Sequence, residues 1–392
     1  MLRLHNIKLP LSYHSKSLIQ AAAKALGVSQ SAVERCEISK KSVDARKKND
    51  VCFVVALDVT LKNPQDEKRI AARLTPSVGG LAAPYTPPAV IKLERAPAVR
   101  PIVVGFGPAG LFAALTLAEA GACPIVLERG QDVDIRTRDV HAYWSRGAEA
   151  FSPSSNVQFG EGGAGTFSDG KLNTGTKDPR GEHILRTFVR FGAPHDILID
   201  AKPHIGTDKL CGVVKAMRMR ILELGGEVRF GARLTSVLHS NGHVTAVRYI
   251  DAQGEQELPA ESVILAIGHS ARDTFESLLA GGITLVQKPF SIGARIEHPQ
   301  SLINASQYGA AASHPALGAA DYKLALHLPG GRSVYTFCMC PGGTVVAAAS
   351  EPDSVVTNGM SYYARDGVNA NSALLVGVGP EDFGSEHPLA GM

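Results

Sequence analysis

The sequence has few cysteines and no long apolar run. Its six cysteines are scattered over 392 residues, and only two of them, two positions apart, are close in sequence. A C-x-C pair is too sparse for a structural zinc site, so we expect reduced thiols and no bound metal. No apolar run reaches the roughly 20 residues that span a bilayer. The amino terminus also has no compact apolar stretch with a small-residue cleavage site, so we expect a cytoplasmic protein without membrane contact.

The composition is that of a globular chain with an uneven charge distribution. Hydrophobic residues make up 44% and charged residues 20% of the chain, and its length suggests two or three domains. The net charge is +3, but residues 1–75 carry 14 Lys/Arg and 7 Asp/Glu, which leaves −4 for the remainder. The ordinary interpretation of this basic amino-terminal segment is that its charges lie on a solvated surface. The alternative is a docking site for nucleic acid or for an acidic partner.

Residues 1–75 have the pattern of a small basic α/β domain. We expect a strand over 4–11, a helix over 16–26 and a strand over 51–61, in a split β-α-β arrangement. Residues 76–98 are rich in proline and glycine, and the pair at 87–88 fixes an extended path. This segment is therefore predicted to be a linker.

A nucleotide-binding pattern follows the linker. A short apolar strand ends at Gly105, the glycines Gly105, Gly107 and Gly110 open a helix, and a second strand ends at Glu128. The first glycine permits a tight turn, the second lets the backbone approach a pyrophosphate, and the third lets helix and strand pack closely. The helix amino terminus directs N–H groups at the phosphates, and the acid can accept hydrogen bonds from a ribose. The predicted cofactor-binding residues here are Gly105, Gly107, Pro108, Ala109, Gly110, Glu128 and Arg129.

A second pattern indicates which dinucleotide binds. Residues 228–258 alternate as a strand meander, and residues 262–268 form an apolar strand that ends in glycine. This run resembles the glutathione-reductase-type flavoproteins, in which the last strand meets the cofactor at an Ala-x-Gly corner. Ala266 and Gly268 match that corner, and Leu234 lies where that class places backbone contacts to the adenine. The resemblance implies FAD in preference to NAD.

The stretch from 159 to 171 is unusually rich in glycine. It contains five glycines, so it can lay backbone amides against phosphates or a planar ring. We predict that it wraps the flavin, and the alternative is a mobile surface loop. Lys171 is a candidate for stabilising negative charge on the reduced ring, or else a surface lysine. The predicted cofactor-binding residues here are Gly162, Gly163, Ala164, Gly165, Thr166, Ser168, Asp169, Gly170 and Lys171.

The last third of the chain is predicted to form an antiparallel sheet that holds substrate. The expected strands are 289–299, 322–328, 333–340 and 344–350. Arg295 is a candidate for binding an anionic substrate, and pairing with Glu297 or with another strand is the alternative. Cys338 and Cys340 share one side of their strand by its period of two. A redox pair beside the flavin is one interpretation of these thiols, although such neighbours are awkward for a disulfide.

Three segments carry a family resemblance, and they are residues 163–172, 289–299 and 335–343. They look like a family of FAD-dependent dehydrogenases often labelled NAD(FAD)-utilizing dehydrogenases. The resemblance implies an α/β fold in which a Rossmann-like FAD-binding domain, residues 99–285, is joined to an inserted β-rich substrate domain, residues 286–392. It also implies a flavin oxidoreductase without identifying a substrate.

The resemblance also implies a departure from the usual pattern. Such flavoproteins finish with a glycine-rich strand-to-helix segment whose amides meet the flavin, and nothing after Gly268 supplies one. We therefore expect a shortened chain with an incomplete substrate domain and weakened FAD retention.

The leading functional prediction is an FAD-dependent oxidoreductase, either a dehydrogenase or a reductase, acting on a small-molecule substrate or electron acceptor. A second Rossmann motif is missing from the sequence, so NAD(P)H is expected to bind only transiently as an electron donor. Two alternatives stay open: a flavin-containing RNA-associated protein, and a flavin-binding remnant without turnover. The thirteen histidines are spread too widely to identify a catalytic acid or base. The candidate catalytic residues are Lys171, Arg295, Cys338 and Cys340.

Overall fold

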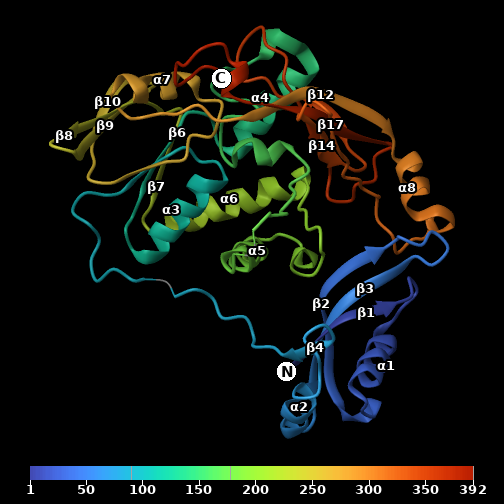
Figure 1. Ribbon diagram of the computed structural model, residues 1–392. Coiled ribbons are helices and arrows are strands. Elements are labelled where there is room, and N and C mark those ends of the chain that lie inside the picture. The colour runs from blue at the N-terminus through green and yellow to red at the C-terminus, as the bar shows by residue number, and fades with distance from the viewer. Residues whose placement is uncertain (90, 177, 392) are drawn as a thin grey trace. The chain divides into compact units, whose positions relative to one another are not determined.

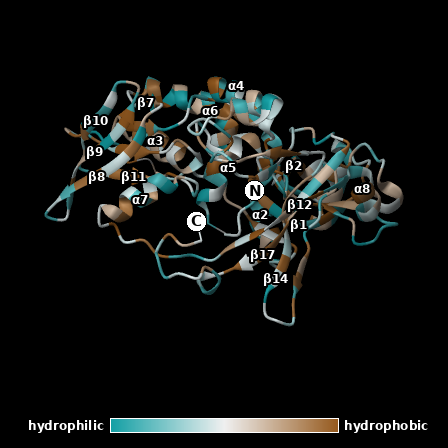
Figure 2. Ribbon diagram, turned by 90° about the horizontal axis from the view of Figure 1, so that it is seen from above, coloured by the Kyte–Doolittle hydropathy of each residue, from teal (hydrophilic) through white to brown (hydrophobic). Residues whose placement is uncertain are grey.

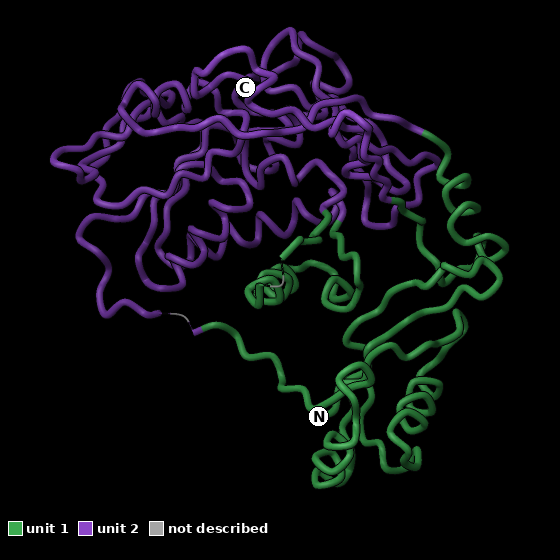
Figure 3. The backbone as a smooth tube through the Cα atoms, in the orientation of Figure 1, with its two compact units in different colours: residues 1–88, 171–205, 298–322 green, residues 89–170, 206–297, 323–392 purple. Residues whose placement is uncertain are grey.

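The computed structural model describes residues 1–89, 91–176 and 178–391. The chain divides into two compact units (Figure 3). The first contains Met1–Pro88, Lys171–Ile205 and His298–Tyr322, and the second contains Ala89–Gly170, Gly206–Glu297 and Lys323–Met392. These bounds differ from the division expected at residues 75, 98 and 285, because two later segments pack with the amino-terminal one.

The first unit contains a four-stranded antiparallel sheet with strand order β2-β3-β1-β4. Its strands are β1 (Leu2–Leu9), β2 (Val33–Asp44), β3 (Cys52–Leu61) and β4 (Gly79–Leu81). Strands β1 and β2 each pair antiparallel with β3, so they run parallel to one another with β3 between them. With helix α1 (Ser15–Leu26) between them in the chain, these strands form the expected split β-α-β arrangement.

One face of this sheet forms the core of the first unit. Leu2, Leu4 and Leu57 are fully buried there, and α1 and α2 (Pro64–Ala71) cover them. Strand β4 falls within residues 76–98, where the sequence predicts a linker, and it pairs with β1. The later segments add α5 (Arg180–Arg190) and α8 (Gln300–Tyr308) to this unit (Figure 1).

The second unit is built on a four-stranded parallel sheet of order β11-β5-β6-β7. Its strands are β5 (Ile102–Val104), β6 (Ile125–Glu128), β7 (Glu227–Phe230) and β11 (Val263–Leu265). The accompanying helices are α3 (Pro108–Ala120), α4 (Val133–Arg146), α6 (Thr207–Glu223) and α7 (Arg272–Ala280). Strand β5 is buried throughout, as expected for the centre of a parallel sheet.

The two faces of this parallel sheet have different coverings. The largely apolar helix α3 packs beside α6 and against the strands (Figures 1 and 2). Ile102 and Leu127 pack on the other side against Leu234 and Val247 of the antiparallel meander. The meander consists of β8 (Arg233–Ser240), β9 (His243–Asp251) and β10 (Gly254–Pro259). Helix, sheet and meander therefore form three layers, and the ends of β5, β6 and β11 open beside the glycine turn.

The last third of the chain adds a second sheet of order β12-β17-β14-β13 and a hairpin. The strands of the sheet are β12 (Phe290–Pro299), β13 (Ala325–His327), β14 (Ser333–Cys340) and β17 (Asn369–Val378), and those of the hairpin are β15 (Thr344–Ala347) and β16 (Thr357–Met360). The 3-10 segments are η1 (Gln30–Ala32), η2 (Gly147–Ala150), η3 (Gly163–Phe167), η4 (His195–Leu198), η5 (Gly309–Ala311) and η6 (Pro380–Asp382). Among the residues that the structure describes, no helix has both the length and the apolar character needed to cross a bilayer.

Candidate cofactor site

A cleft of about 630 Å³ opens at the carboxyl ends of the parallel strands. It lies wholly in the second unit, and its volume falls in the range of about 300–1,000 Å³ that is usual for ligand sites. Three predicted regions meet there: the turn from β5 to α3, the glycine loop, and the corner after β11. The predicted residues that line it are Gly105, Gly107, Pro108, Ala109, Glu128, Arg129, Gly163, Ala164, Gly165, Leu234, Ala266 and Gly268.

The three glycines of the turn are required for different reasons. Gly105 has φ +91°, and a Cβ there would lie 2.4 Å from the carbonyl oxygen of Ala266. A Cβ at Gly110 would lie 1.8 Å from the carbonyl oxygen of Gly105, so the helix meets the strand only through glycine. A Cβ at Gly107, by contrast, would meet only the Cα of Gly163, at 3.7 Å. The protein itself leaves room beside Gly107, which fits a site kept clear for a ligand's phosphates.

The Glu128 carboxylate accepts hydrogen bonds from two of the segments that line the cleft. It is 4% exposed, and its Oε2 accepts the backbone N–H of Phe106 at 2.6 Å. Its Oε1 accepts the N–H groups of Gly130 and Gly160 at 2.8 and 3.0 Å. The predicted ribose acceptor therefore also joins the turn after β5 to the glycine loop.

A buried arginine that was not among the predicted site residues organises the glycine loop. Arg136 on α4 has no exposed surface, and its guanidinium lies 4.9 Å from the ring centroid of Phe167. Burial lowers the pKa of Arg136 to about 10, so it stays charged at neutral pH. It donates to five carbonyl oxygens, those of Asn156, Val157, Gly160, Glu161 and Gly163, at 2.6–3.4 Å.

A signal for Arg136 exists in the sequence. Val133, Arg136 and Val140 recur at helical spacing and are the buried residues of α4. An arginine between two valines on the inward face of a helix indicates a buried guanidinium, which must donate hydrogen bonds to buried acceptor atoms.

Glu161 is a second buried charge in the loop that was not predicted. It has no exposed surface, accepts the N–H of Val133 at 2.8 Å and pairs with the Nε of Arg218 at 2.9 Å. Burial raises the pKa of Glu161 and outweighs the two donors, which favour the charged form. Arg136 and Glu161 therefore bind the loop on its buried side, and most residues of the loop are buried and do not lie at the surface.

Arg129 closes the cleft toward helix α7. Its Nη2 donates to Asp273 at 2.7 Å and to the Thr274 hydroxyl at 2.8 Å, and its guanidinium lies 4.4 Å from the centroid of Phe159. Burial acts to raise the pKa of Asp273, but hydrogen bonds and charge from Arg129 lower it overall, with a further contribution from Arg233. The apolar wall supplied by α7 and its flanks, which includes Phe275 and Leu278, was not predicted either.

Several predicted residues, most of them in the glycine loop, lie outside the lining of the cleft. Thr166 is buried, and its carbonyl accepts the Thr207 hydroxyl at 2.6 Å. Asp169 is buried and pairs with Arg365. Lys171 belongs to the first unit, where its backbone bridges to His204. The predicted residues outside the lining are Gly110, Gly162, Thr166, Ser168, Asp169, Gly170 and Lys171.

The other candidate catalytic residues gather around Asn371. The Nη1 of Arg295 donates to the Asn371 Oδ1 at 2.7 Å and to the Cys338 carbonyl at 3.3 Å, which is the pairing with another strand that the sequence allows. Cys338 has φ +48° within an irregularity of β14, so strict alternation does not hold between Cys338 and Cys340. None of the six cysteines, all of which lie among the described residues, forms a disulfide, and the Sγ of Cys340 donates to the Cys338 carbonyl at 3.3 Å.

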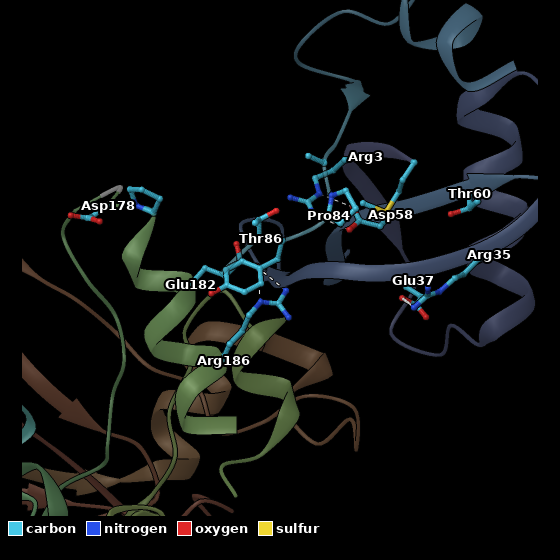
Figure 4. A pocket seen from close by; sticks show the side chains of 14 residues that line it. Arg3, Arg35, Glu37, Asp58, Thr60, Pro84, Thr86, Asp178, Glu182 and Arg186 are labelled. Carbon is cyan, nitrogen blue, oxygen red and sulfur yellow. Dashed lines mark hydrogen bonds and ion pairs between the residues drawn. The ribbon is translucent and has the colours of Figure 1, made fainter. Parts of the chain in front are cut away.

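The first unit holds a charged cleft of about 640 Å³ on the sheet face opposite its core (Figure 4). Arg3 forms a two-point contact with Asp58 at 2.6 and 2.7 Å. Arg186 pairs with Glu182 at 2.8 Å and lies 4.3 Å from the ring centroid of Tyr85. These charges neutralise one another, so this cleft has no clear preference for an anion or a cation.

Two segments of the chain match protein families whose descriptions name FAD. Residues 100–164 match the FAD binding domain family, and residues 289–392 match the family described as FAD-dependent protein, C-terminal domain-like. Residues 1–60 match a domain of unknown function. A protein of Clostridium beijerinckii named "Uncharacterized protein" is 46% identical over 392 residues, which is 100% of this chain and 72% of that protein. The chain belongs to the family of this clostridial protein.

The cofactor of this family member is FAD. The FAD binding domain match covers the turn with Gly105, Gly107 and Gly110 and reaches into the glycine loop. The space beside Gly107 and the apolar cleft fit such a dinucleotide. The narrower resemblance to NAD(FAD)-utilizing dehydrogenases and the shortened carboxyl end stay predictions.

Solved structures show only weak overall similarity. Glycerol-3-phosphate dehydrogenase from Bacillus halodurans, complexed with FAD, is 12% identical with a TM-score of 0.34, over 74% of this chain and 48% of its own. A 3-ketosteroid dehydrogenase from Rhodococcus jostii is 15% identical with a TM-score of 0.33, over 55% of this chain and 59% of its own. The chain thus spans about half the length of these proteins. Similarities this weak indicate nothing about its activity.

Proposed function

We propose that the chain is an FAD-dependent oxidoreductase that acts on a small-molecule substrate, with reduced nicotinamide as a transient electron donor. The observation that carries the proposal is the cleft at the carboxyl ends of the parallel strands, where the turn from β5 to α3 lies against the glycine loop. FAD supplies electron and hydride transfer chemistry when it is bound. A chain that holds this cofactor in an apolar cleft is suited to oxidise or reduce another molecule.

The residues of the cleft have separate tasks in this proposal. The amino terminus of α3 begins at Pro108 and directs the N–H groups of its first turn toward the pyrophosphate. Glu128 accepts amide N–H groups from the two glycine segments, and in this proposal it also accepts a ribose hydroxyl. Leu234 and Phe275 exclude water from the cleft walls. Arg136 and Glu161 act on the cofactor only through the loop that they hold.

Anaerobic stopped-flow measurement of the flavin absorbance tests the proposal. We expect NADH or NADPH to bleach the bound flavin, and an artificial acceptor such as dichlorophenolindophenol to restore its absorbance. Dithionite serves as the control, because it shows how much of the bound flavin can be reduced at all.

Two outcomes contradict different parts of the proposal. If dithionite bleaches the bound flavin but neither NADH nor NADPH does, then NAD(P)H is not the electron donor. Reduced flavin that passes no electrons to the acceptor would overturn the oxidoreductase and favour a flavin-binding remnant without turnover.

A further inference from the structure

The second unit contains another cavity, of about 890 Å³, that the cofactor cleft does not include. Its walls come from the carboxyl half of α4 with the η2 turn, and from the β15–β16 hairpin with the residues that connect and follow its strands. Within the part of the chain that the structure describes, no residue lines both this cavity and the cofactor cleft. It is therefore a separate place where a small molecule can bind.

Five of the side chains that line this cavity carry aromatic rings. Trp144 lies edge-on to His141 with ring centroids 5.4 Å apart, and Tyr143 lies edge-on to Phe151 at 5.3 Å. Tyr362 supplies a further ring from the other side and is 56% exposed. Several rings with faces or edges open to a cavity offer stacking contacts to a flat ligand, and aliphatic walls of the same area do not.

The charge of the lining restricts the ligand further. Among the described residues that line the cavity there is no lysine and no arginine, whereas Glu351 and Asp353 are acidic. The Glu351 carboxylate pairs with Arg272 at 3.1 Å, and among the described residues Asp353 is the acid of the lining that forms no ion pair. A pyrophosphate or phosphate would find no positive partner in this lining. The cavity therefore suits an uncharged ring compound better than a nicotinamide dinucleotide.

The aromatic wall is continuous with the loop of the cofactor cleft. The Trp144 ring lies 6.0 Å from the ring of Phe167, and Phe167 ends the η3 segment whose first residues line that cleft. The Trp144 Nε1 donates to the Ala347 carbonyl at 2.9 Å. Gln158, which lines the cofactor cleft, donates to the next carbonyl, that of Ala348, at 3.1 Å. One layer of side chains thus joins the cavity to the cofactor loop.

We propose that this cavity binds an uncharged planar ring compound, of the quinone or neutral aromatic class, as the organic substrate of the flavoprotein. The role of the cavity as a substrate site rests on the proposed function. Its role as a binding site does not depend on that function. The aromatic walls select a flat ligand, the lining offers an anion no lysine or arginine, and the Trp144–Phe167 contact places the ligand beside the cofactor loop.

The chain provides its own reporter for the test, because Trp144 is its single tryptophan. The holoprotein in its oxidised state is titrated with menadione, and the tryptophan emission is corrected with N-acetyltryptophanamide titrated in parallel. We expect saturable quenching with menadione and none at equal concentration with NAD⁺, a charged dinucleotide that cannot reduce the flavin. No turnover is involved, so a failed flavin reduction and a failed binding experiment are distinguishable.

Matched variants decide whether the signal comes from this cavity. Tyr362→Ala removes an exposed ring of the cavity, and Phe337→Ala removes an equally exposed ring, 59%, from β14 outside it. We expect the first to weaken menadione binding by about 3- to 10-fold and the second to leave it unchanged. Tyr362→Phe, which keeps the ring, should bind like the wild type. Unsaturable quenching, NAD⁺ binding as tightly as menadione, or equal affinity in both alanine variants would overturn the proposal.

Discussion

At the scale of single residues, Arg136 has the largest predicted effect. Arg136→Leu removes the guanidinium that donates to five buried carbonyl oxygens, and the loss of a buried charged partner costs at least about 3 kcal/mol. We expect that loss in the free energy of unfolding, measured by urea denaturation, together with loss of FAD from the purified protein. Arg138→Leu on the exposed side of the same helix is the control and should change stability by less than about 0.5 kcal/mol. Equal stability of the two variants would contradict this role.

Glu161 predicts a pH dependence of stability. Burial raises its pKa above the ordinary value of 4.5, so the folded chain binds this proton more tightly than the unfolded chain. The contribution to stability is then fully present below pH 4.5 and is lost as the pH rises through the folded pKa. Relative to Glu161→Gln, the wild type should therefore lose unfolding free energy as the pH rises through the range above 4.5. Urea denaturation of both proteins across this range measures the difference, and a difference that grows in favour of the wild type contradicts the assignment.

At the scale of elements, the turn from β5 to α3 separates folding from binding. Gly110→Ala places a Cβ against the carbonyl of Gly105 and should destabilise the protein itself. Gly107→Ala meets no protein atom closer than 3.7 Å, so we expect a folded protein that no longer retains FAD. Gly212→Ala, in an open position of α6, should keep both properties and gain up to about 1 kcal/mol. Thermal unfolding together with flavin content after gel filtration compares the three. FAD retention by Gly107→Ala would contradict the site.

The same elements show how much a sequence reveals about this site. The turn, the meander and the corner at Ala266–Gly268 follow from residues close together in the chain, and the structure brings them to one cleft. The buried charges Arg136 and Glu161 were missed, because their acceptors and donors lie on segments whose approach no local pattern encodes. Lys171 shows the reverse case: it adjoins a predicted cofactor loop in sequence, yet its backbone pairs within the first unit.

At the scale of the whole molecule, the unit bounds were beyond the reach of local patterns. A composition break at residues 76–98 indicates a linker, but Tyr85 within it contacts His183 at 3.0 Å and Arg186 through its ring. Lys202 pairs with Asp321 at 2.6 Å, which ties together two segments more than 100 residues apart within the first unit. Such long-range pairings decide which segments share a unit, and sequence periodicity contains no information about them.

The division into units leads to a prediction about FAD binding. Every residue that lines the cofactor cleft belongs to the second unit, so the free energy of FAD binding stabilises that unit directly. Hydrogen exchange measured with and without FAD should therefore slow in β5, α3, β11 and the glycine loop. Strands β1 and β3 of the first unit serve as the internal control, and we expect their exchange to stay the same. Equal protection of β1, β3 and the cleft segments would mean that the two units unfold as one, and that the cofactor stabilises the entire chain.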